Sequence, residues 1–483
     1  MIYNTIEKEE PVMGILKDLQ PKEVLYYFEE LCAIPHGSLD TKRISDYCVA
    51  FAKERGLAYV QDESNNVVIY KPATPGYEDH PTVILQGHLD MVCEKDADCD
   101  IDFSKDGLRL CHDGEYIFAK GTTLGGDDGI AVAYALALLD AKDVKHPALE
   151  CVFTVDEEIG MLGADAMDMS VLKGRLLLNC DSEDEGVLTV SCAGGARSDF
   201  KLPLVWEEAD PCYCLRIEDL LGGHSGVEIH KGRANANKLM GELLRGLPVR
   251  LVSIEGGSKD NAIPRACTAY VCSRDPNFAR SLRPLWESLK ATLPETETAV
   301  RFSCEEAQCQ RMMTEEAGAA VLGLLYDLPN GVQAMSTDIE GLVQTSLNLG
   351  IVETTEDYVR MAFSVRSSVN EEKAALLQTL RALAQVYGAA YEESGHYPAW
   401  EYRKESLLRD TMVSTYAELY GKEPIVEAIH AGLECGLFCD RLPGLDAVSF
   451  GPQMHDIHTS RERLSIASVK RTWDYLLAVL ERL

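Results

Sequence analysis

The sequence predicts an α/β protein in which a mixed, mostly parallel sheet is flanked by helices and an α+β domain is inserted into the chain. Apolar strand-like runs alternate with helical patterns over the first 190 residues, which is typical of an at least partly parallel sheet. From about residue 194 the pattern changes to half-exposed strands and amphipathic helices. After residue 396 strand, loop and helix return. We therefore expect residues 1–192 and 396–483 to form one domain, and 193–395 an inserted domain.

The individual elements follow from hydrophobic periodicity and from the residues that end helices. Residues 14–33 and 40–56 have helical patterns, which end before Pro35 and at Gly56. The stretch "LAYVQDESNNVVIYKP" predicts a hairpin with a polar turn. Buried strands are expected at "TVILQG", "LECVFTV", "GRLLLNCD" and "DAVSFGP". Further helices are expected at "DDGIAVAYALALLDA", which is apolar enough to be largely buried, and at the terminal "IASVKRTWDYLLAVLERL".

Composition excludes several classes of function. The chain has 483 residues, with 46 Lys and Arg against 78 Asp and Glu, for a net charge of −32. So acidic a surface argues against nucleic acid or an anionic membrane as partner. No apolar run is long enough to span a membrane, and the N-terminal "MIYNTIEKEEPVMG" lacks the pattern of a signal peptide. The sixteen scattered cysteines are therefore expected to be buried thiols of a cytoplasmic protein.

Several segments share one arrangement, in which an apolar strand is followed by residue types that bind metals. The ligand types are His88 and Asp90 after "VILQG", Asp156, Glu157 and Glu158 after "LECVFTV", Asp181 after "RLLLNC", and His455 and His458 after "AVSFGPQM". The segment "GTTLGGDDGIAVA" adds Asp127 and Asp128 at a predicted helix start. In open α/β sheets, ligands gather at the carboxyl ends of strands. Histidines and carboxylates converging there predict a divalent metal site.

Each of these residues has a simpler explanation when it is taken alone. Asp127 or Asp128 could cap the helix, because the helix dipole favours Asp at an N-terminus. The "DEE" run could be a solvated loop, and a single His after a strand is more often structural. The repetition of the same pattern at matching strand ends favours a site.

The chemistry of a two-metal site distributes the roles among these residue types. Two metal ions need one bridging carboxylate and about two further ligands each, so five ligands are enough. Adjacent glutamates point in different directions, so one can bind a metal while the other acts as general base. Asp90, two residues beyond His88, can accept the other imidazole N–H and orient the ring.

Seven motifs together carry a family resemblance that covers the chain from about residue 20 to its end. They are "GHLDMV", "GTTLGGDDGI", "TVDEEIGMLGA", "NCDSEDEG", "GGHSGVEIHKGRANA", "IHAGLECGLF" and "GPQMHDIHTSRERL". They resemble the aminoacyl-histidine dipeptidase (peptidase D) branch of the co-catalytic zinc metallopeptidases, a family that includes carboxypeptidase G, aminoacylase and tripeptidase T. The resemblance implies the dizinc exopeptidase fold, with a catalytic domain and the insert as a lid.

The resemblance also implies a ligand set for two zinc ions. Asp127 would bridge the ions, with His88 and Asp181 on one of them and Glu158 and His458 on the other. Two alternatives stay open. Members of the branch often have Asn after the bridging Asp, whereas this chain has Asp128, which competes formally with Asp127. His455 could likewise exchange with His458.

Catalytic and substrate-binding roles follow from the same resemblance. Asp90 would orient His88, Glu157 would be the general base, and His224 in the lid would stabilise the tetrahedral oxyanion. His430, in "IHAGLECG", is expected near the substrate. The further substrate-binding residues implied are Asn261 in "DNAIP", Arg366 in "SVRSS" and Glu434 in "IHAGLECG".

The expected function is dizinc-dependent hydrolysis of unblocked dipeptides, including Xaa-His and β-alanyl-histidine, by metal-activated water with a glutamate base. One alternative is an aminoacylase or desuccinylase acting on N-acyl amino acids, and another is a metal-binding protein without catalysis. Cobalt or manganese could replace zinc, since His and carboxylate ligands admit all three. A dipeptide is the expected partner; monomer and homodimer both stay open, as do an open and a closed lid.

Overall fold

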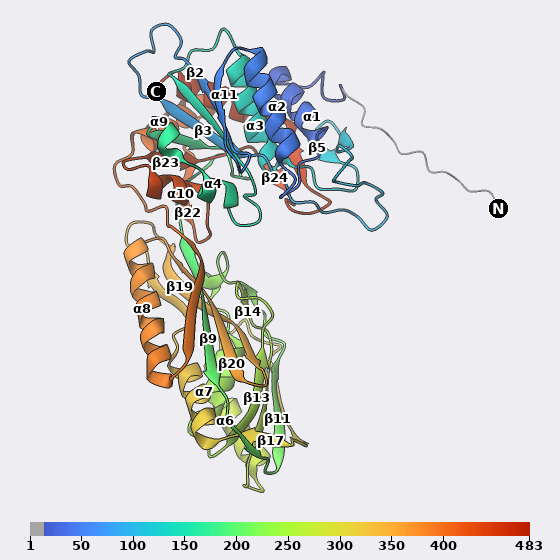
Figure 1. Cartoon of the computed structure of the whole chain (residues 1–483), viewed down its shortest axis with the longest axis vertical. Coiled ribbons are helices and arrows are strands. Elements are labelled where there is room, and N and C mark those ends of the chain that lie inside the picture. The colour runs from blue at the N-terminus through green and yellow to red at the C-terminus, as the bar shows by residue number, and fades with distance from the viewer. Residues whose placement is uncertain (1–13) are drawn as a thin grey trace, which may run out of the picture. The chain divides into compact units, whose positions relative to one another are not determined.

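The chain folds into two units, and the computed structural model describes residues 14–483 (Figure 1). The first unit comprises the described chain up to Val190, Arg403–Glu427 and Leu433–Leu483. The second comprises Ser191–Tyr402 and Ala428–Gly432. The N-terminal segment on which the prediction of no signal peptide depends lies almost entirely outside the described residues.

An eight-stranded mixed sheet lies at the centre of the first unit. In spatial order its strands are β1 (Ala58–Gln61), β2 (Val67–Lys71), β6 (Leu149–Thr154), β3 (Val83–His88), β7 (Leu176–Asn179), β23 (Asp446–Ser449), β8 (Val187–Cys192) and β22 (Ile425–Ile429). The four neighbours β6, β3, β7 and β23 run parallel. β1, β2 and β6 pair antiparallel, as do β23 and β8. The structure therefore confirms a mixed sheet, in which parallel pairing is confined to the central strands.

Helices cover both faces of this sheet, as the pleat of β3 shows. Gln86 Nε2 donates a hydrogen bond to Glu434, the first residue of α10 (Glu434–Arg441). Gly87, the next residue, faces α3 (Gly126–Asp140), because a Cβ added there would lie 2.5 Å from the Cβ of Ala131. Successive strand residues point to opposite faces of a sheet. α3 and α10 therefore lie on opposite faces, and nearly every residue of α3 is buried, as predicted.

The remaining elements of the first unit complete these helical layers and add a small sheet. The helices are α1 (Lys22–Cys32), α2 (Lys42–Glu54), α4 (Leu162–Ala166), α9 (Leu407–Tyr420) and α11 (Ile466–Leu480). The small sheet contains β24 (Met454–His455), β25 (Arg463–Ser465), β5 (Tyr116–Ala119) and β4 (Leu110–His112). The first helix is shorter than the expected 14–33, because it begins after Pro21, a residue that suits the start of a helix.

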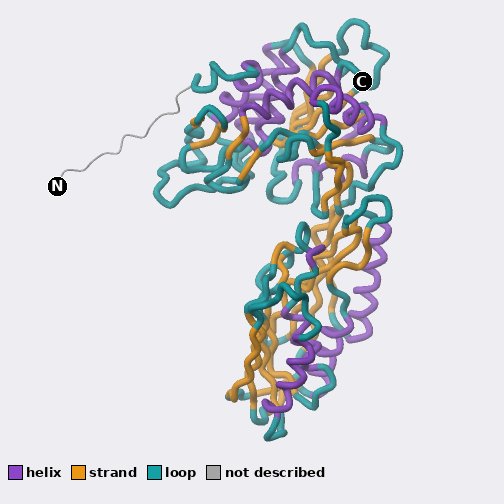
Figure 2. The backbone as a smooth tube through the Cα atoms, turned by 180° about the vertical axis from the view of Figure 1, so that it is seen from behind, coloured by secondary structure: helices purple, strands orange, loops and turns teal. Residues whose placement is uncertain are grey.

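The second unit is a nine-stranded antiparallel sheet with helices along one side (Figure 2). In order its strands are β16 (Arg301–Ala307), β11 (Cys212–Glu218), β15 (Cys267–Cys272), β13 (Arg250–Gly256), β19 (Val343–Thr354), β20 (Tyr358–Ser367), β9 (Gly194–Pro203) and β21 (Ala390–Tyr397), with β18 (Gly331–Met335) beside β19. The helices are α5 (Ala236–Leu244), α6 (Phe278–Lys290), α7 (Glu315–Asp327) and α8 (Asn370–Tyr387). They bury side chains such as Leu282, Val321 and Leu380 in one core with Phe200 and Phe363 of the sheet. Short pairs complete the unit: β10 (Trp206–Glu208) with β17 (Arg311–Met313), and β12 (Gly223–His224) with β14 (Ala262–Ile263).

The second unit is longer than the insert expected at 193–395. β21 runs past that boundary to Tyr397 and pairs with β9, and the main chains of Cys192 and Trp400 exchange hydrogen bonds of 3.0 and 3.1 Å. Residues 428–432 also belong to this unit, and the Ala193 N–H donates to the Ile429 carbonyl at 3.2 Å. A segment of this length carries no periodic pattern, so its place in the second unit could not be predicted from the sequence.

One pair of cysteines departs from the expectation of free thiols throughout. Cys212 and Cys309 form a disulfide. β11 carries Cys212 and pairs with β16 opposite Ala307, two residues before Cys309. Cross-strand pairing therefore brings the two Cα atoms to 6.2 Å, which is within the range of a disulfide.

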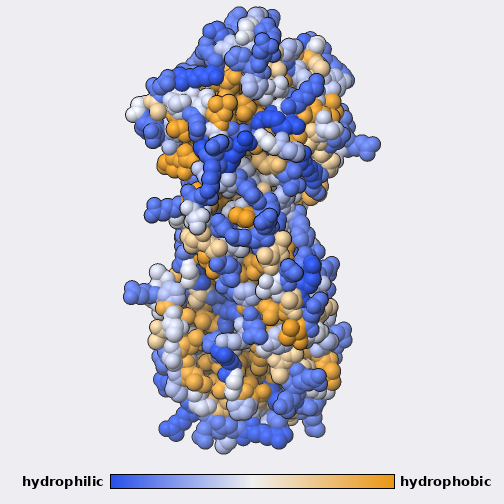
Figure 3. Space-filling model, turned by 90° about the vertical axis from the view of Figure 1, so that its left-hand side faces the viewer, coloured by the Kyte–Doolittle hydropathy of each residue, from blue (hydrophilic) through white to orange (hydrophobic). Residues whose placement is uncertain are grey.

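The surface mixes hydrophilic and hydrophobic side chains on both units in the view of Figure 3. Among residues 14–483, no helix combines the length and the apolar character needed to cross a membrane.

Replacing Gly87 should destabilise the first unit, because a Cβ there would lie 2.6 Å from Asp128 Oδ2 as well as 2.5 Å from Ala131. We expect Gly87→Ala to lower the free energy of unfolding by about 1–3 kcal/mol, as overpacking does. Chemical denaturation followed by circular dichroism measures the loss. Gly129→Ala is the matched control: it lies in α3, its nearest neighbour is Phe28 at 3.5 Å, and alanine favours a helix. An unfolding midpoint in Gly87→Ala equal to that of the control would contradict the close packing.

Candidate metal centre

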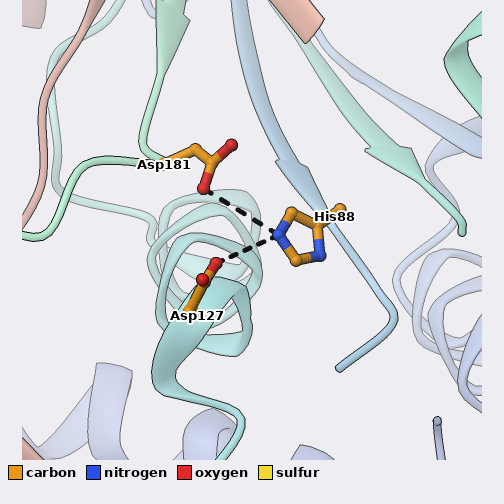
Figure 4. Close-up of side chains that lie close together, drawn as sticks. All are labelled: His88, Asp127 and Asp181. Carbon is orange, nitrogen blue, oxygen red and sulfur yellow. Dashed lines mark hydrogen bonds and ion pairs between the residues drawn. The ribbon is translucent and has the colours of Figure 1, made fainter. Parts of the chain in front are cut away.

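The carboxyl ends of three neighbouring parallel strands place candidate ligands at one edge of the first-unit sheet. His88 is the last residue of β3, Glu158 follows β6, and Asp181 follows β7. The start of α3 adds Asp127, and the loop after β24 adds His458. Figure 4 shows His88, Asp127 and Asp181 pointing toward one another from three different elements.

Asp127 lies between the two histidines. Its Oδ1 is 3.1 Å from His88 Nε2, and its Oδ2 is 3.0 Å from His458 Nε2. His88 Nε2 is also 3.8 Å from Asp181 Oδ1, and His458 Nε2 is 3.0 Å from Glu158 Oε2. These contacts define two groups that could each hold a metal ion, His88–Asp127–Asp181 and Asp127–Glu158–His458. The two groups share one carboxylate, which is the arrangement that a bridged metal pair requires.

The geometry distinguishes both pairs of alternatives that the sequence left open. Asp128 is fully buried and points away from the two groups, and its Oδ2 accepts the main-chain N–H of His88 at 3.1 Å. The ring of His455 packs instead against Tyr116, with centroids 5.7 Å apart. Of each pair of alternatives, the fold therefore brings Asp127 and His458 into the ligand groups.

Asp90 connects the His88 strand to the glutamate loop. Its Oδ1 is 3.5 Å from His88 Nδ1, whose nearest partner, at 3.0 Å, is the Asp90 carbonyl oxygen. The Asp90 carboxylate also accepts the main-chain N–H groups of Glu157 at 3.0 Å and Glu158 at 3.4 Å, and the Ser38 hydroxyl at 2.8 Å. Asp90 therefore contacts the His88 ring through its carbonyl oxygen and, through its buried carboxylate, the loop that carries the two glutamates.

The two adjacent glutamates differ in their surroundings. Glu158 turns toward His458, and its Oε1 is buried without a hydrogen-bond partner. Glu157 belongs to neither ligand group of the described chain. Burial raises the pKa of Glu157 to about 8, with the negative charges of Glu434 and Asp127 adding to the rise. A carboxyl group that titrates near neutral pH suits a general base.

Glu434 lies beneath the same edge of the sheet rather than on the surface. It is fully buried, and its Oε2 accepts hydrogen bonds from Gln86 Nε2 at 2.5 Å and Thr154 Oγ1 at 2.7 Å. Its Oε1 is buried without a partner. Burial raises the pKa of Glu434 to about 7.

The remaining predicted residues lie in the second unit. His224 pairs with Ala262 across β12 and β14, next to Asn261. His224 Nδ1 accepts the main-chain N–H groups of Gly226 at 3.1 Å and Val227 at 3.3 Å, which leaves Nε2 as the protonated nitrogen.

Arg366 and His430 each have a side-chain partner in this unit. Arg366 Nη1 donates to the Tyr397 hydroxyl at 3.0 Å, and its Nε is buried without a partner. His430 Nε2 lies 2.7 Å from Ser346 Oγ. Burial, and after it the charge of Arg366, lowers the pKa of both His224 and His430, in the latter to about 3. Both imidazoles are therefore neutral at physiological pH.

Comparison with known proteins identifies the family. Residues 84–482 match the model of peptidase family M20/M25/M40. The chain belongs to this family. It is 38% identical to the cytosol non-specific dipeptidase of Escherichia coli (strain K12), over 98% of this chain and 99% of that protein. The crystal structure of aminoacylhistidine dipeptidase from Vibrio alginolyticus has a TM-score of 0.93 and 39% identity, and the match covers 97% and 98% of the two chains.

A more distant match shares the fold. The crystal structure of the aminopeptidase PepT from Bacillus cereus ATCC 10987 matches at a TM-score of 0.56 with 16% identity, over 96% of this chain and 98% of that one. The family membership confirms the resemblance carried by the seven motifs, and it confirms that this M20 peptidase is a hydrolase of peptide bonds.

Sequence reasoning missed several residues that contact the predicted site residues within each unit. Ser38 donates to the Asp90 carboxylate, and Glu462 binds the turn before Asp127. In the second unit, Ser346 contacts His430 and Tyr397 contacts Arg366. Glu462 stands inside a quoted motif, four residues after His458, so its position was visible although its role was not. The other three lie in segments without any metal-ligand pattern.

The donor set fits divalent cations. Two imidazole nitrogens and three carboxylates suit zinc, manganese or cobalt. Burial, with the negative charges of Asp128 and Asp127, raises the pKa of Asp181 well above its usual range. Hydrogen bonds to Asp127 and Glu158 raise the pKa of His458 to about 10. Positive charge at the shared carboxylate would relieve this repulsion, and the unpartnered Glu158 Oε1 offers a further lone pair.

The metal-depleted M20 peptidase should lose stability as pH rises from 5 to 8. In the folded protein the pKa values of Glu157 and Glu434 are about 8 and 7, whereas in the unfolded chain both return to the ordinary value of 4.5. The folded state therefore binds more protons than the unfolded state in this pH window. Their stabilising contribution is complete below about pH 4.5 and is lost as pH rises through 7 to 8. The free energy of unfolding should fall by up to about 1.4 kcal/mol per pH unit for each group.

Chemical denaturation of the metal-depleted protein at several pH values measures this slope. Glu434→Gln removes one of the titrating carboxyl groups and should flatten the profile. A free energy of unfolding that does not change between pH 5 and 8 would show that these carboxyl groups titrate normally.

Proposed function

We propose that this M20 peptidase hydrolyses unblocked dipeptides with two divalent metal ions, zinc being the expected metal, held by the five clustered ligands. The observation that carries the proposal is the Asp127 carboxylate, with one oxygen toward His88 and the other toward His458. In this assignment Asp181 completes one site and Glu158 the other, and Asp127 bridges them. The two relatives that are 38% and 39% identical to this chain are dipeptidases, which supports dipeptides over N-acyl amino acids as substrates.

Glu157 is the general base in this proposal. When bound, two such ions polarise the scissile carbonyl and lower the pKa of the attacking water. The Glu157 carboxylate takes a proton from that water and returns it to the leaving amine. Asp90 supports this step, because it holds the Glu157 main-chain N–H at 3.0 Å while it lies beside the His88 ring. The adjacent glutamates therefore divide metal binding and proton transfer between them.

The second unit supplies substrate-binding residues in the role of a lid. The planar guanidinium of Arg366 can bind both oxygens of a carboxylate, which suits the free C-terminus of a dipeptide. Neutral His224, with its proton on Nε2, can donate to the oxyanion that forms at the scissile carbonyl. Asn261 lies next to the strand partner of His224. Like Arg366, it holds the terminal carboxylate or the scissile carbonyl of the substrate. The buried Glu434 supports the site from below, through Gln86 and Thr154.

The proposed substrates include Xaa-His dipeptides, and the proposed location is the cytosol. The similarity to an aminoacylhistidine dipeptidase and to a cytosol non-specific dipeptidase supports both points.

Glu157→Ala should keep both metal ions and lose nearly all hydrolysis. Loss of a general base lowers kcat by about 10²–10⁴-fold. Hydrolysis of Ala-His, with bound metal counted by elemental analysis, tests both halves of the expectation. Glu63→Ala, which removes an exposed carboxylate in the same unit, is the control and should retain activity. Substantial residual turnover in Glu157→Ala would rule out the assigned role.

A substrate comparison separates the dipeptidase from the other candidate activities. The metal-loaded enzyme should release histidine from Ala-His faster than it releases the amino acid from an N-acetyl amino acid. Faster cleavage of the N-acetyl compound would instead identify an aminoacylase. Two bound zinc ions without hydrolysis across a dipeptide panel would identify a metal-binding protein without catalysis.

A further inference from the structure

The turn that leads into α3 presents four main-chain N–H groups to one distant carboxylate. Glu462 Oε2 accepts from Leu124 at 2.8 Å and Gly125 at 3.3 Å, and Oε1 accepts from Gly126 at 2.8 Å and Asp127 at 3.4 Å. Glu462 is 3% exposed. Consecutive N–H groups at a helix start form a concave site for an anion. Here the chain itself provides that anion, and no side chain of the N-cap residue makes the bond.

The two glycines of "LGGDD" permit this contact. Gly125 has a φ of 67°, in the left-handed region that glycine adopts without strain. A Cβ at Gly126 would lie 3.2 Å from Glu462 Oε1, so a larger residue would push the carboxylate away. The turn is therefore shaped to receive the Glu462 carboxylate.

Glu462 comes from the loop that also carries His458. The loop runs from β24 to β25, and β25 pairs with β5, so both of its ends are held in the small sheet. His458 and Asp127 meet at 3.0 Å, 331 residues apart in sequence. Glu462 joins the same two segments a second time, through the main chain of Asp127.

We propose that Glu462 is a positioning residue that fixes Asp127 relative to His458 and so sets the spacing of the bridged metal site. This inference rests on the proposed two-metal function, because it assigns Asp127 as the bridge. Glu462 belongs to neither ligand group of the described residues, and its contact with Asp127 is to the main-chain N–H. It acts through the N–H groups that determine where the Asp127 side chain begins. Its two oxygens each serve two donors, which a neutral amide cannot do, because half of the amide would present N–H groups to N–H groups.

The test compares Glu462→Gln with a matched buried glutamate. Glu150 is also 3% exposed and accepts the main-chain N–H groups of Lys173 and Gly174 at 3.0 Å, but it lies on β6 near the opposite end of the strand. Glu150→Gln therefore controls for the loss of a buried carboxylate that binds main-chain groups. Chelator competition with Zn²⁺ measures both metal affinities, and the absorption spectrum of the Co²⁺-loaded protein reports ligand geometry.

We expect Glu462→Gln to weaken at least one Zn²⁺ affinity by about 10- to 100-fold, the effect typical of groups that orient metal ligands. Its Co²⁺ spectrum should change, and amide hydrogen exchange in 124–127 should become faster. Glu150→Gln should leave the affinities and the spectrum unchanged. Wild-type affinities and an unchanged spectrum in Glu462→Gln would overturn the proposal, as would equal losses in both variants.

Two further outcomes keep this proposal distinct from the proposed function. If the wild-type protein binds fewer than two zinc ions, the two-metal function fails, and amide exchange still tests the positioning role. Unchanged exchange of 124–127 in Glu462→Gln overturns that role, and faster exchange supports it.

If Glu462→Gln does not fold, Glu462→Asp is the second variant, because it keeps the charge and withdraws the carboxylate by one methylene. It should show the same loss of affinity and the same spectral change, and wild-type values in it would overturn the proposal.

Discussion

The two oxygens of the Asp127 carboxylate face two different imidazoles, and the arrangement of the first unit depends on this sharing. His88 reaches Asp127 from the end of a central strand, and His458 reaches it from a loop near the end of the chain. The parallel strands deliver further carboxylates to the same edge, so one small region concentrates negative charge around two histidines. A cation bound there would offset this repulsion.

Three buried carboxylates that are not proposed ligands hold the main chain of the residues that are. Asp128 accepts the N–H of His88, Asp90 accepts the N–H groups of Glu157 and Glu158, and Glu462 accepts that of Asp127. Three of the five proposed ligands, His88, Glu158 and Asp127, are thus held at their main-chain N–H groups. A held backbone restricts each of these ligands to a few rotamers. Long side chains on a mobile backbone would leave the spacing of two ions loosely defined.

Hydrophobic periodicity was sufficient to predict the central strands and the main helices, and the strand ends supplied candidate ligand types, but the set of five ligands was implied only by the family resemblance. It could not decide between Asp127 and Asp128, since that choice depends on the direction of each side chain at the start of α3. The role of Glu462 could not be predicted for a related reason, because its partners lie about 335 residues away in the sequence. No local pattern indicates that a carboxylate will bind main-chain N–H groups. The bond between Cys212 and Cys309 and the boundary beyond residue 395 depend likewise on strand pairing, which periodicity does not reveal.

The chain passes between the two units four times, after Val190, Tyr402, Glu427 and Gly432. The last two passages enclose only Ala428–Gly432, so His430 belongs to the second unit while Glu434, four residues later, belongs to the first. The motif "IHAGLECG" is therefore divided between the units. A chimera that exchanges the second unit of one M20 peptidase for that of another must accordingly transplant two pieces, the long segment 191–402 and the five residues 428–432, because the long segment alone would leave Ser346 beside a foreign histidine loop.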